Sequence, residues 1–149
     1  MAVRSAASAD PIVAADIAVV AVPLERTIRL GAFCASEREY AALRVHTASG
    51  LEGFALGYTR GLPLAQRLAA RAAAVVGADA SDFAAATAIL AAAADTVDVR
   101  ASSLVEIALW DLAAKRAEQP LWRLLGGNSE RVPVLAVGGY FMDERPLSD

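Results

Sequence analysis

The 149-residue chain has one cysteine, Cys34, one histidine, His46, and no apolar run long enough to cross a membrane. A single cysteine excludes an internal disulfide, and no second cysteine or neighbouring histidine supports a reactive thiol at this position. The most apolar early segment, residues 12–24, is interrupted by Asp16 and contains Pro23, so it predicts neither a membrane helix nor a signal peptide. We therefore expect a cytoplasmic protein that does not enter the membrane.

Basic residues are also few and scattered, with 14 Lys and Arg against 17 Asp and Glu and a net charge of -3. Such a chain has no electrostatic footprint for nucleic acid. Hydrophobic residues make up 56% of the chain and charged residues 21%, which excludes a disordered protein and fits one globular domain. The patterns G-x-S-x-G, G-x-G-x-x-G and the P-loop are missing, which disfavours a hydrolase or a nucleotide-binding enzyme.

Residues with strand propensity fill the first part of the chain. β-Branched residues at 12–13 and 17–22 predict a first strand, and alternation over 40–47 predicts a second, with Leu43, Val45 and Thr47 on one face. A turn at 49–50 then leads into a third strand at 51–58, which returns antiparallel. The connection 24–39 has mixed charge, and a loop of this length in a compact domain is functional or mobile. We expect a three-stranded antiparallel meander.

Helical spacing replaces the alternation from Pro63 onward. A first helix is predicted up to Gly77, and Asp79 or Ser81 is expected to cap a second helix that continues to residue 90. The capping-box pattern at 103–106 marks a third helix, although its start lies earlier if residues 100–101 are helical. Pro120 begins a fourth helix, which the glycines at 126–127 end. The fold class is therefore α+β, a meander followed by a helical bundle.

The apolar run 132–137 predicts a short buried strand. A buried strand needs neighbours on both sides, so this strand either joins the meander or opens a second domain. Pro133 cannot donate a ladder hydrogen bond, which disfavours a central place in the meander. We therefore assign residues 1–11 to a flexible tail, 12–130 to one domain, and 131–149 to the start of another.

The segment 101–127, ASSLVEIALWDLAAKRAEQPLWRLLGG, resembles the end of the N-terminal capping domain of the enolase superfamily, in the mandelate racemase and muconate lactonizing enzyme group. The family form is roughly A-x-S-A-x-D-x-A-L-W-D-x-x-G-K, then P-L-x-x-L-L-G-G, then a barrel strand V-P-V-Y. The resemblance extends back through 44–53 and 57–59 and covers most of the chain in the same order. It departs at Val105, Glu106 and Ala114, where the family usually has Ala or Ile, Asp and Gly.

The resemblance implies a division of labour between two domains. In the family, a C-terminal (β/α) barrel holds Mg²⁺ on three carboxylates and supplies Lys or His bases that remove a proton α to a carboxylate. The capping domain covers the barrel and selects the substrate. The resemblance places Ile28, in the 24–39 connection, and Tyr58, at the end of the third strand, against the substrate. It gives this chain no catalytic residue and no metal ligand, because a barrel needs about 200 residues and the chain stops at Asp149.

We therefore expect the capping domain of an enzyme that acts on an α-hydroxy acid or an acid sugar by racemisation, cycloisomerisation or dehydration. The chain alone is expected to be inactive, with Mg²⁺ bound only by the full-length enzyme. The implied partners are a barrel domain, missing or on a separate chain, a carboxylate substrate, and a second copy in a homo-oligomer. A non-catalytic interaction module that keeps the capping fold is the alternative, and a fragment, a truncated gene product and a split enzyme all remain open.

The other polar residues have plainer interpretations. His46 is expected to be solvated or structural and not catalytic, because no carboxylate is near it in sequence. Asp111 and Lys115 are spaced for a helical surface pair worth about 0.3–0.5 kcal/mol, or for a bond to the barrel. The loop charges are expected to be solvated, although they could reach a polar substrate: Glu25, Arg26 and Arg29.

Overall fold

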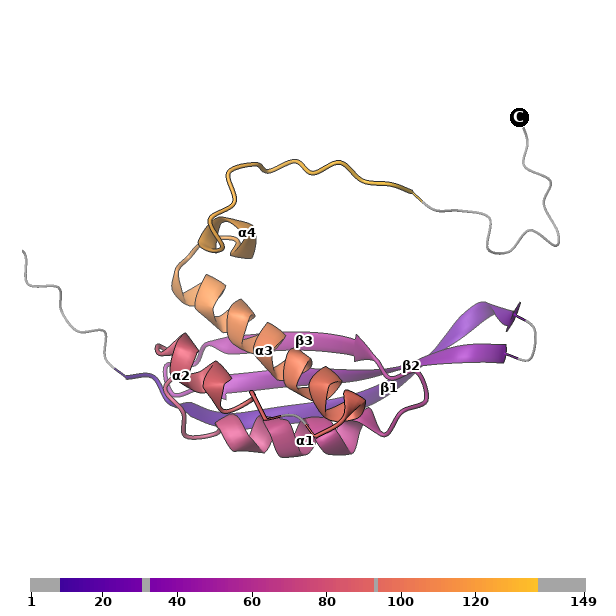
Figure 1. Ribbon diagram of the computed structural model, residues 1–149, viewed down its shortest axis with the longest axis horizontal. Helices are drawn as coiled ribbons and strands as arrows, with labels where there is room; N and C mark the ends of the chain where they lie inside the picture. The colour runs from indigo at the N-terminus through magenta and orange to yellow at the C-terminus, as the bar shows by residue number, and fades with distance from the viewer. Residues whose placement is uncertain (1–8, 31–32, 93, 137–149) are drawn as a thin grey trace, which may run out of the picture.

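The computed structural model describes residues 9–30, 33–92 and 94–136. Three antiparallel strands form one sheet in the order β1-β2-β3, and four helices follow along the chain (Figure 1). This arrangement confirms the predicted α+β class. The elements are β1 Ile12–Leu30, β2 Phe33–Thr47, β3 Glu52–Tyr58, α1 Leu64–Val75, α2 Phe83–Ala88, α3 Thr96–Arg116 and α4 Leu121–Leu124.

The sheet follows the alternation of the sequence. Leu43, Val45 and Thr47 of β2 are buried on one face, as predicted, while Arg44 lies on the other. The turn between β2 and β3 contains Gly50 at φ +87°, a conformation that L-residues with side chains rarely adopt. This geometry confirms the turn predicted at 49–50 and sets the register of the hairpin, in which Leu43 pairs with Ala55.

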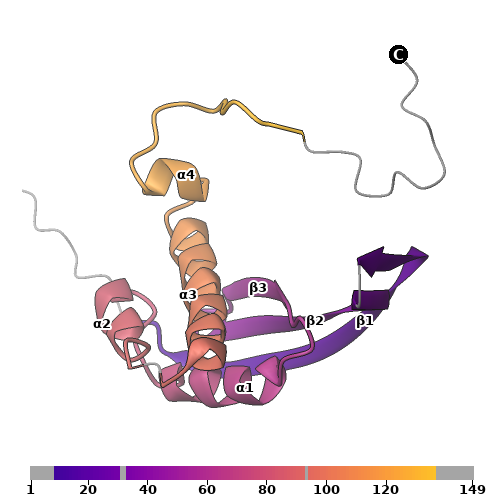
Figure 2. The ribbon, with the colours of Figure 1, turned by 45° about the vertical axis from the view of Figure 1, so that its right-hand side comes forward.

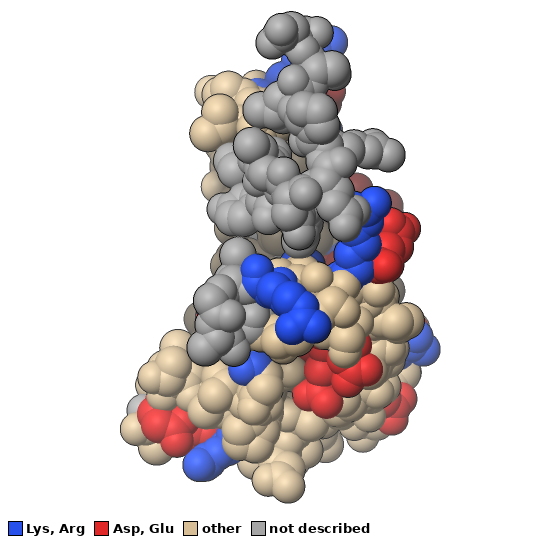
Figure 3. Space-filling model, turned by 90° about the vertical axis from the view of Figure 1, so that its right-hand side faces the viewer, with Lys and Arg blue, Asp and Glu red and all other residues tan. Residues whose placement is uncertain are grey.

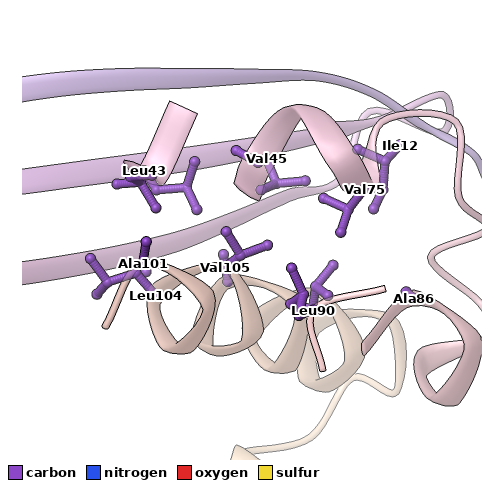
Figure 4. Packing of buried hydrophobic residues seen from close by; sticks show 14 of the residues in the cluster. Ile12, Leu43, Val45, Val75, Ala86, Leu90, Ala101, Leu104 and Val105 are labelled. Carbon is purple, nitrogen blue, oxygen red and sulfur yellow. The ribbon is translucent and has the colours of Figure 1, made fainter. Parts of the chain in front are cut away.

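The core lies between one face of the sheet and the helices. The predicted apolar stripe of α1 is confirmed, because Leu64, Leu68, Ala72 and Val75 are all buried. Helix α3 packs on α1 and on β3 and has nine buried residues. Figure 4 shows three of them, Ala101, Leu104 and Val105, on the side of α3 that faces Leu43 and Val45 of β2. In Figures 1 and 2, α1 and α3 both lie on the same side of the sheet, and no helix of the described part of the chain covers the opposite face.

The inward face of β3 consists of small residues. A Cβ added at Gly53 would lie 2.7 Å from Leu112 Cγ and still closer to the carbonyl oxygen of Ala108, and one added at Gly57 would lie 2.8 Å from Leu104 Cδ1. Ordinary van der Waals contact begins at 3.4 Å. Strand β3 therefore lets the backbone of α3 approach the sheet more closely than any larger side chain would allow.

The prediction of a long loop at residues 24–39 is wrong. Strands β1 and β2 continue through it as an antiparallel arm that leaves the helix-covered part of the sheet (Figure 1). Pairing shifts between Pro23 and Ile28, where the four residues 24–27 stand opposite Ser36 alone. Most of the described side chains of this arm are exposed on both faces, so the segment lacks the alternation that would have indicated strands.

The start of α2 differs from its prediction, and α3 takes the earlier start that the sequence allowed, because residues 100–101 are helical. Asp82, rather than Asp79 or Ser81, caps α2 by accepting the N–H of Ala85 at 3.0 Å, since Asp79 is occupied by the N–H of Asp10. Helix α3 begins at Thr96, where Asp95 accepts the N–H of Asp98 at 2.8 Å. Ser103 therefore lies within the helix and does not cap it, and its hydroxyl donates a hydrogen bond to the carbonyl of Val99.

The predicted strand at 132–137 is not formed over 132–136, and Val137 lies outside the described residues. Val132, Val134 and Leu135 are 73%, 86% and 89% exposed. A strand forms only where its backbone groups find partners, and no strand of the described sheet pairs with this segment. Helix α4 likewise buries none of its residues, so the chain from α4 to residue 136 is only loosely attached to the body.

The beginning of the chain is held more firmly than a tail. Residues 1–8 of the assigned tail 1–11 lie outside the described residues, but Asp10 is 5% exposed and Pro11 forms a β-bridge with Asp79. The ordered body therefore begins before Ile12. Across the described ranges, no helix is both long and apolar enough to cross a membrane.

Candidate functional site

Tyr58 is held by its neighbours at the end of β3. Its ring lies with its centroid 5.6 Å from that of Tyr40, and the guanidinium of Arg38 lies 5.9 Å from the ring centroid. Arg100 of α3 donates a hydrogen bond to the carbonyl of Tyr58. Two side chains of β2 therefore contact the half-buried ring, while Arg100 of α3 holds the backbone of the same residue.

Ile28 occupies the arm, after the shift in pairing, where it is half-buried and pairs with Ala35. Alternation along β2 from Ala35 to Tyr40 puts Ile28 and Tyr58 on opposite faces of the sheet. The two predicted substrate contacts thus share the arm end of the sheet without forming one cluster. Glu25 and Arg29 are exposed, as expected of solvated charges, and Cys34 is an exposed free thiol opposite Arg29.

His46 has carboxylate partners that the sequence did not indicate. Its Nε2 lies 2.8 Å from Asp16 of β1 and its Nδ1 lies 3.2 Å from Glu52 of β3. Arg44 Nε lies 3.7 Å from Glu52. The strand register could have revealed this cluster. Asp16 of β1 pairs with Arg44 of β2, and His46 of β2 pairs with Glu52 of β3, so the four side chains lie on one face of the sheet.

The described residues do not form a metal centre. No group of three or more His, Cys, Asp and Glu side chains among them has the geometry to hold an ion. The cluster around His46 is also open to solvent, with the Asp16 side chain 76% exposed, whereas resident metal ligands are usually held by a second shell. These residues therefore do not fit the Mg²⁺ that the resemblance implies for a full-length enzyme.

A cleft of about 460 Å³ lies where the start of the chain meets the β2–β3 turn and the end of α3. Burial would raise the pKa of Asp10, which lines this cleft, but hydrogen bonds from the Ser49 hydroxyl and backbone N–H and the nearby Arg116 charge hold that pKa below its usual value. The carboxylate is thus fully engaged by the protein. It joins three parts of the fold and is not free to bind a ligand.

Asp98 and Asp79 have lowered pKa values for similar reasons. For Asp98, the Arg71 side chain donates at 2.9 Å and the backbone N–H of Ala94 at 3.2 Å. For Asp79, the backbone N–H groups of Asp10 and Ser81 both donate at 2.9 Å. The perturbed carboxylates therefore connect secondary-structure elements and do not gather around a reaction site.

The predicted Asp111–Lys115 pair is present at 2.7 Å and has a further role. Asp111 accepts the backbone N–H of Phe54 at 2.9 Å, and the Lys115 ammonium donates to the carbonyl of Glu52 at 2.7 Å. Together with Arg100, these side chains of α3 satisfy outward-facing backbone groups of β3, which is an edge strand. The Trp-Asp-x-x-x-Lys pattern thus serves to join helix and sheet. Trp110 packs on Phe83 of α2 with ring centroids 4.0 Å apart.

Charged side chains do not gather into a single large patch on the face that Figure 3 shows, where acidic and basic groups alternate over an otherwise uncharged surface. This distribution agrees with the scattered charge of the sequence and gives that face no phosphate-binding stripe.

A three-stranded antiparallel meander whose edge strand is bonded to the long helix α3 is the architecture of N-terminal domains found in enolase-type enzymes. The family model for the mandelate racemase / muconate lactonizing enzyme N-terminal domain matches residues 13–126, and the chain belongs to this family. A structure of an enolase superfamily member from Polaromonas sp. JS666 is similar with a TM-score of 0.76 and 25% identity, over 91% of this chain and 38% of that one. A racemase from Streptomyces coelicolor A3(2) solved with bound magnesium has a TM-score of 0.74 and 27% identity, over 83% and 37%.

Among curated proteins, the 3,6-anhydro-alpha-L-galactonate cycloisomerase of Streptomyces coelicolor is 53% identical over 49 residues, which are 33% of this chain and 13% of that protein. The arabinonate dehydratase of Saccharolobus solfataricus is 40% identical over 43 residues, or 12% of its length. The matches thus span about an eighth of the length of these curated relatives and less than two fifths of the solved structures.

Proposed function

We propose that this chain is the substrate-selecting cap of a magnesium-dependent enzyme that acts on a carboxylate, either an α-hydroxy acid or an acid sugar. The observation that carries the proposal is the family match over residues 13–126. In this proposal a barrel domain supplies the metal ligands and the bases, and the chain alone is inactive. The relatives include a dehydratase and a cycloisomerase of sugar acids, which supports the same substrate class.

The apolar end of the chain supports a docked barrel. Leu121 and Leu125 of α4 are 38% and 60% exposed, and Val134 and Leu135 beyond them are more exposed still. Apolar side chains concentrated on a segment without its own core mark a docking surface. We assign residues 131–149 to the start of the barrel domain on this basis.

The arm end of the sheet is the proposed region of substrate contact. Tyr58 presents a ring that contacts Tyr40 and Arg38, on a backbone that Arg100 holds, and Ile28 supplies an apolar side chain on the arm. Substrate selection requires groups that are rigidly placed, because each mispositioned contact weakens discrimination between similar substrates. A ring that packs on β2, on a backbone bonded by α3, meets this requirement.

The first experiment assays the purified chain with Mg²⁺ and a panel of sugar acids and α-hydroxy acids. No turnover is expected, because the described residues hold no metal centre. Turnover by the chain alone that stops when Mg²⁺ is removed would refute the proposal that a separate barrel domain supplies the metal ligands and the bases.

The second experiment joins residues 9–130, which include the buried Asp10, to the barrel of the Streptomyces coelicolor cycloisomerase. In an active chimera, Tyr58→Ala and Ile28→Ala are each expected to lower kcat/KM about tenfold or more, mainly through KM. Val76→Ala is the matched control, because Val76 is 44% exposed at the opposite end of the domain. Equal effects of all three substitutions would contradict the assignment of the substrate contacts.

A further inference from the structure

The turn that follows β3 has a backbone conformation that one of its residues does not favour. We call residues 59–62 the β3 turn. Arg60 has φ +55° and Gly61 has φ +72°, so two consecutive residues lie in the left-handed region. Glycine adopts this region readily, but an arginine does so at a cost in free energy. A strained backbone of this kind persists only where the contacts around it hold it in place.

Strand β2 holds one side of the β3 turn through Thr59. The backbone N–H of Thr59 donates to the carbonyl of Glu39 at 2.9 Å, and its hydroxyl donates to the same carbonyl at 3.2 Å. The carbonyl of Thr59 accepts the N–H of Leu62 at 3.1 Å. Thr59 is 1% exposed, so its bonds are shielded from water. On this side, neutral hydrogen bonds within the body fix the turn.

Helix α3 holds the other side through Arg100. Thr59 bonds Glu39 of β2, so alternation along the strand turns the carbonyl of Tyr58 away from β2, toward the edge of the sheet. Arg100, in the second turn of α3, donates to that carbonyl. A hydrogen bond from a guanidinium is charge-assisted and stronger than one from a neutral donor. The end of β3 is therefore held from both sides.

The bond to Tyr58 accounts for Arg100 better than an ion pair does. Arg71 of α1 lies 2.9 Å from the carboxylate of Asp98, as is usual for an arginine packed between helices. Arg100 forms no ion pair with the residues that the structure describes, and its hydrogen bond goes to the carbonyl of Tyr58. A half-buried cation without a counter-ion is costly, so the carbonyl that it bonds is its structural purpose.

We propose that Arg100 is a positioning residue for the substrate contact at Tyr58. Its bond from α3 opposes relaxation of the strained β3 turn and so fixes the place of Tyr58 at the end of the sheet. Arg100 acts through the backbone of Tyr58 and does not itself touch the substrate. The inference rests on the proposed function, because it concerns the same contact. A displacement of about 1 Å at such a contact can lower the rate about 100-fold.

The first test measures amide hydrogen exchange in the 149-residue chain by NMR. Arg100→Met removes the donor and keeps most of the side-chain volume, and it is expected to speed exchange at the N–H groups of Thr59 and Leu62 about tenfold or more. Arg100→Lys keeps a charged donor and is expected to restore most of the protection.

Lys115→Met is the matched control for this test. Lys115 also donates from α3 to a carbonyl of β3, that of Glu52, but at the other end of the strand. It is expected to leave exchange in the β3 turn unchanged. Exchange at Thr59 and Leu62 that Arg100→Met does not alter, or that Lys115→Met speeds equally, overturns the proposal.

The second test uses the chimera with the cycloisomerase barrel. Arg100→Met is expected to raise KM about tenfold with little change in kcat, and Arg100→Lys is expected to recover most of this loss. The double variant of Tyr58→Ala and Arg100→Met is expected to be no worse than Tyr58→Ala alone, because Arg100 acts through Tyr58. Effects of the two changes that multiply overturn the proposal.

Failure of the inference and failure of the proposed function give different results in the chimera. If Tyr58→Ala leaves kcat/KM unchanged, the substrate contact itself is wrong, and the inference falls with it. If Tyr58→Ala lowers kcat/KM and Arg100→Met does not, the substrate contact stands and the positioning role of Arg100 is refuted.

Discussion

The substitution Gly53→Ala tests the close approach of α3 to β3. A Gly-to-Ala change at a compatible position normally stabilises a protein by about 0.4–1 kcal/mol, because it restricts the unfolded chain. The backbone at Gly53 is not in the left-handed region, so alanine meets no conformational penalty there. The added Cβ, however, would lie 2.7 Å from Leu112 Cγ, and contact at 3.4 Å would require a displacement of about 0.7 Å.

The obstacle at Gly53 includes backbone, because the carbonyl oxygen of Ala108 lies closer still. Helix α3 must therefore move as a whole, and its packing on β3 and α1 loosens along its length. Overpacking of this kind costs about 1–3 kcal/mol and occasionally more, and we expect a net loss near the upper value. That is a large part of the roughly 5–15 kcal/mol of a typical domain.

Urea unfolding followed by circular dichroism measures this loss, and Gly57→Ala is the matched control. The Cβ added at Gly57 meets only the end of the Leu104 side chain, at 2.8 Å, which can rotate away. We expect Gly57→Ala to cost about 1 kcal/mol or less. A Gly53→Ala variant that is as stable as Gly57→Ala, or more stable than the native chain, would refute the reasoning.

Three further changes probe other parts of the fold. Leu68→Ala should lower the free energy of unfolding by about 2–5 kcal/mol in urea, since Leu68 is 0% exposed. Asp111→Ala should cost about 1 kcal/mol and speed hydrogen exchange at the N–H of Phe54, which loses its acceptor. The lowered pKa of Asp10 gives stability that is complete above its unfolded value of 3.8 and is lost as the pH falls through the folded value. Asp10→Asn should therefore be less stable at neutral pH and lose less stability on acidification than the native chain.

Each of these has an outcome that contradicts it. Unchanged stability of Leu68→Ala would mean that the interface of α1 with the sheet is not packed as described. Exchange at Phe54 that is unaffected by Asp111→Ala would show that another group protects this amide. A pH dependence of Asp10→Asn as steep as that of the native chain would assign the acid sensitivity to Asp79 and Asp98 instead.

The sequence predicted best where one face of an element is buried and the other is not. The alternation at Leu43 and Val45 and the spacing of Leu64 and Leu68 both report burial directly, and both are confirmed. The arm gave no such signal, because its described residues are mostly exposed on both sides. The cap of α2 was misplaced for a different reason, since Asp79 is engaged by the N–H of Asp10, 69 residues away in sequence.

The candidate site was harder to predict because its members come from different strands. The position of Tyr58 at the end of β3 followed from the third strand, but its contacts with Tyr40 and Arg100 depend on register and on the placement of α3. The two carboxylates beside His46 are also distant in structure-forming steps. Asp16 lies 30 residues before His46 in the sequence, and Glu52 lies on the next strand, after the β2–β3 turn. Local sequence carries no information on such pairings until the hairpins are in place.

The polar side chains of α3 that bond β3 also determine at which edge of the sheet another strand could be added. Asp111 and Lys115 occupy backbone groups that a fourth strand would need on that side, so an added strand has no ladder to join there. On the opposite side, the backbone bonds among the described residues join the start of β1, at Ile12, to the segment after α1. A peptide designed to extend this sheet, or a misfolded chain that recruits it, is therefore expected to pair with β1 beyond Ile12.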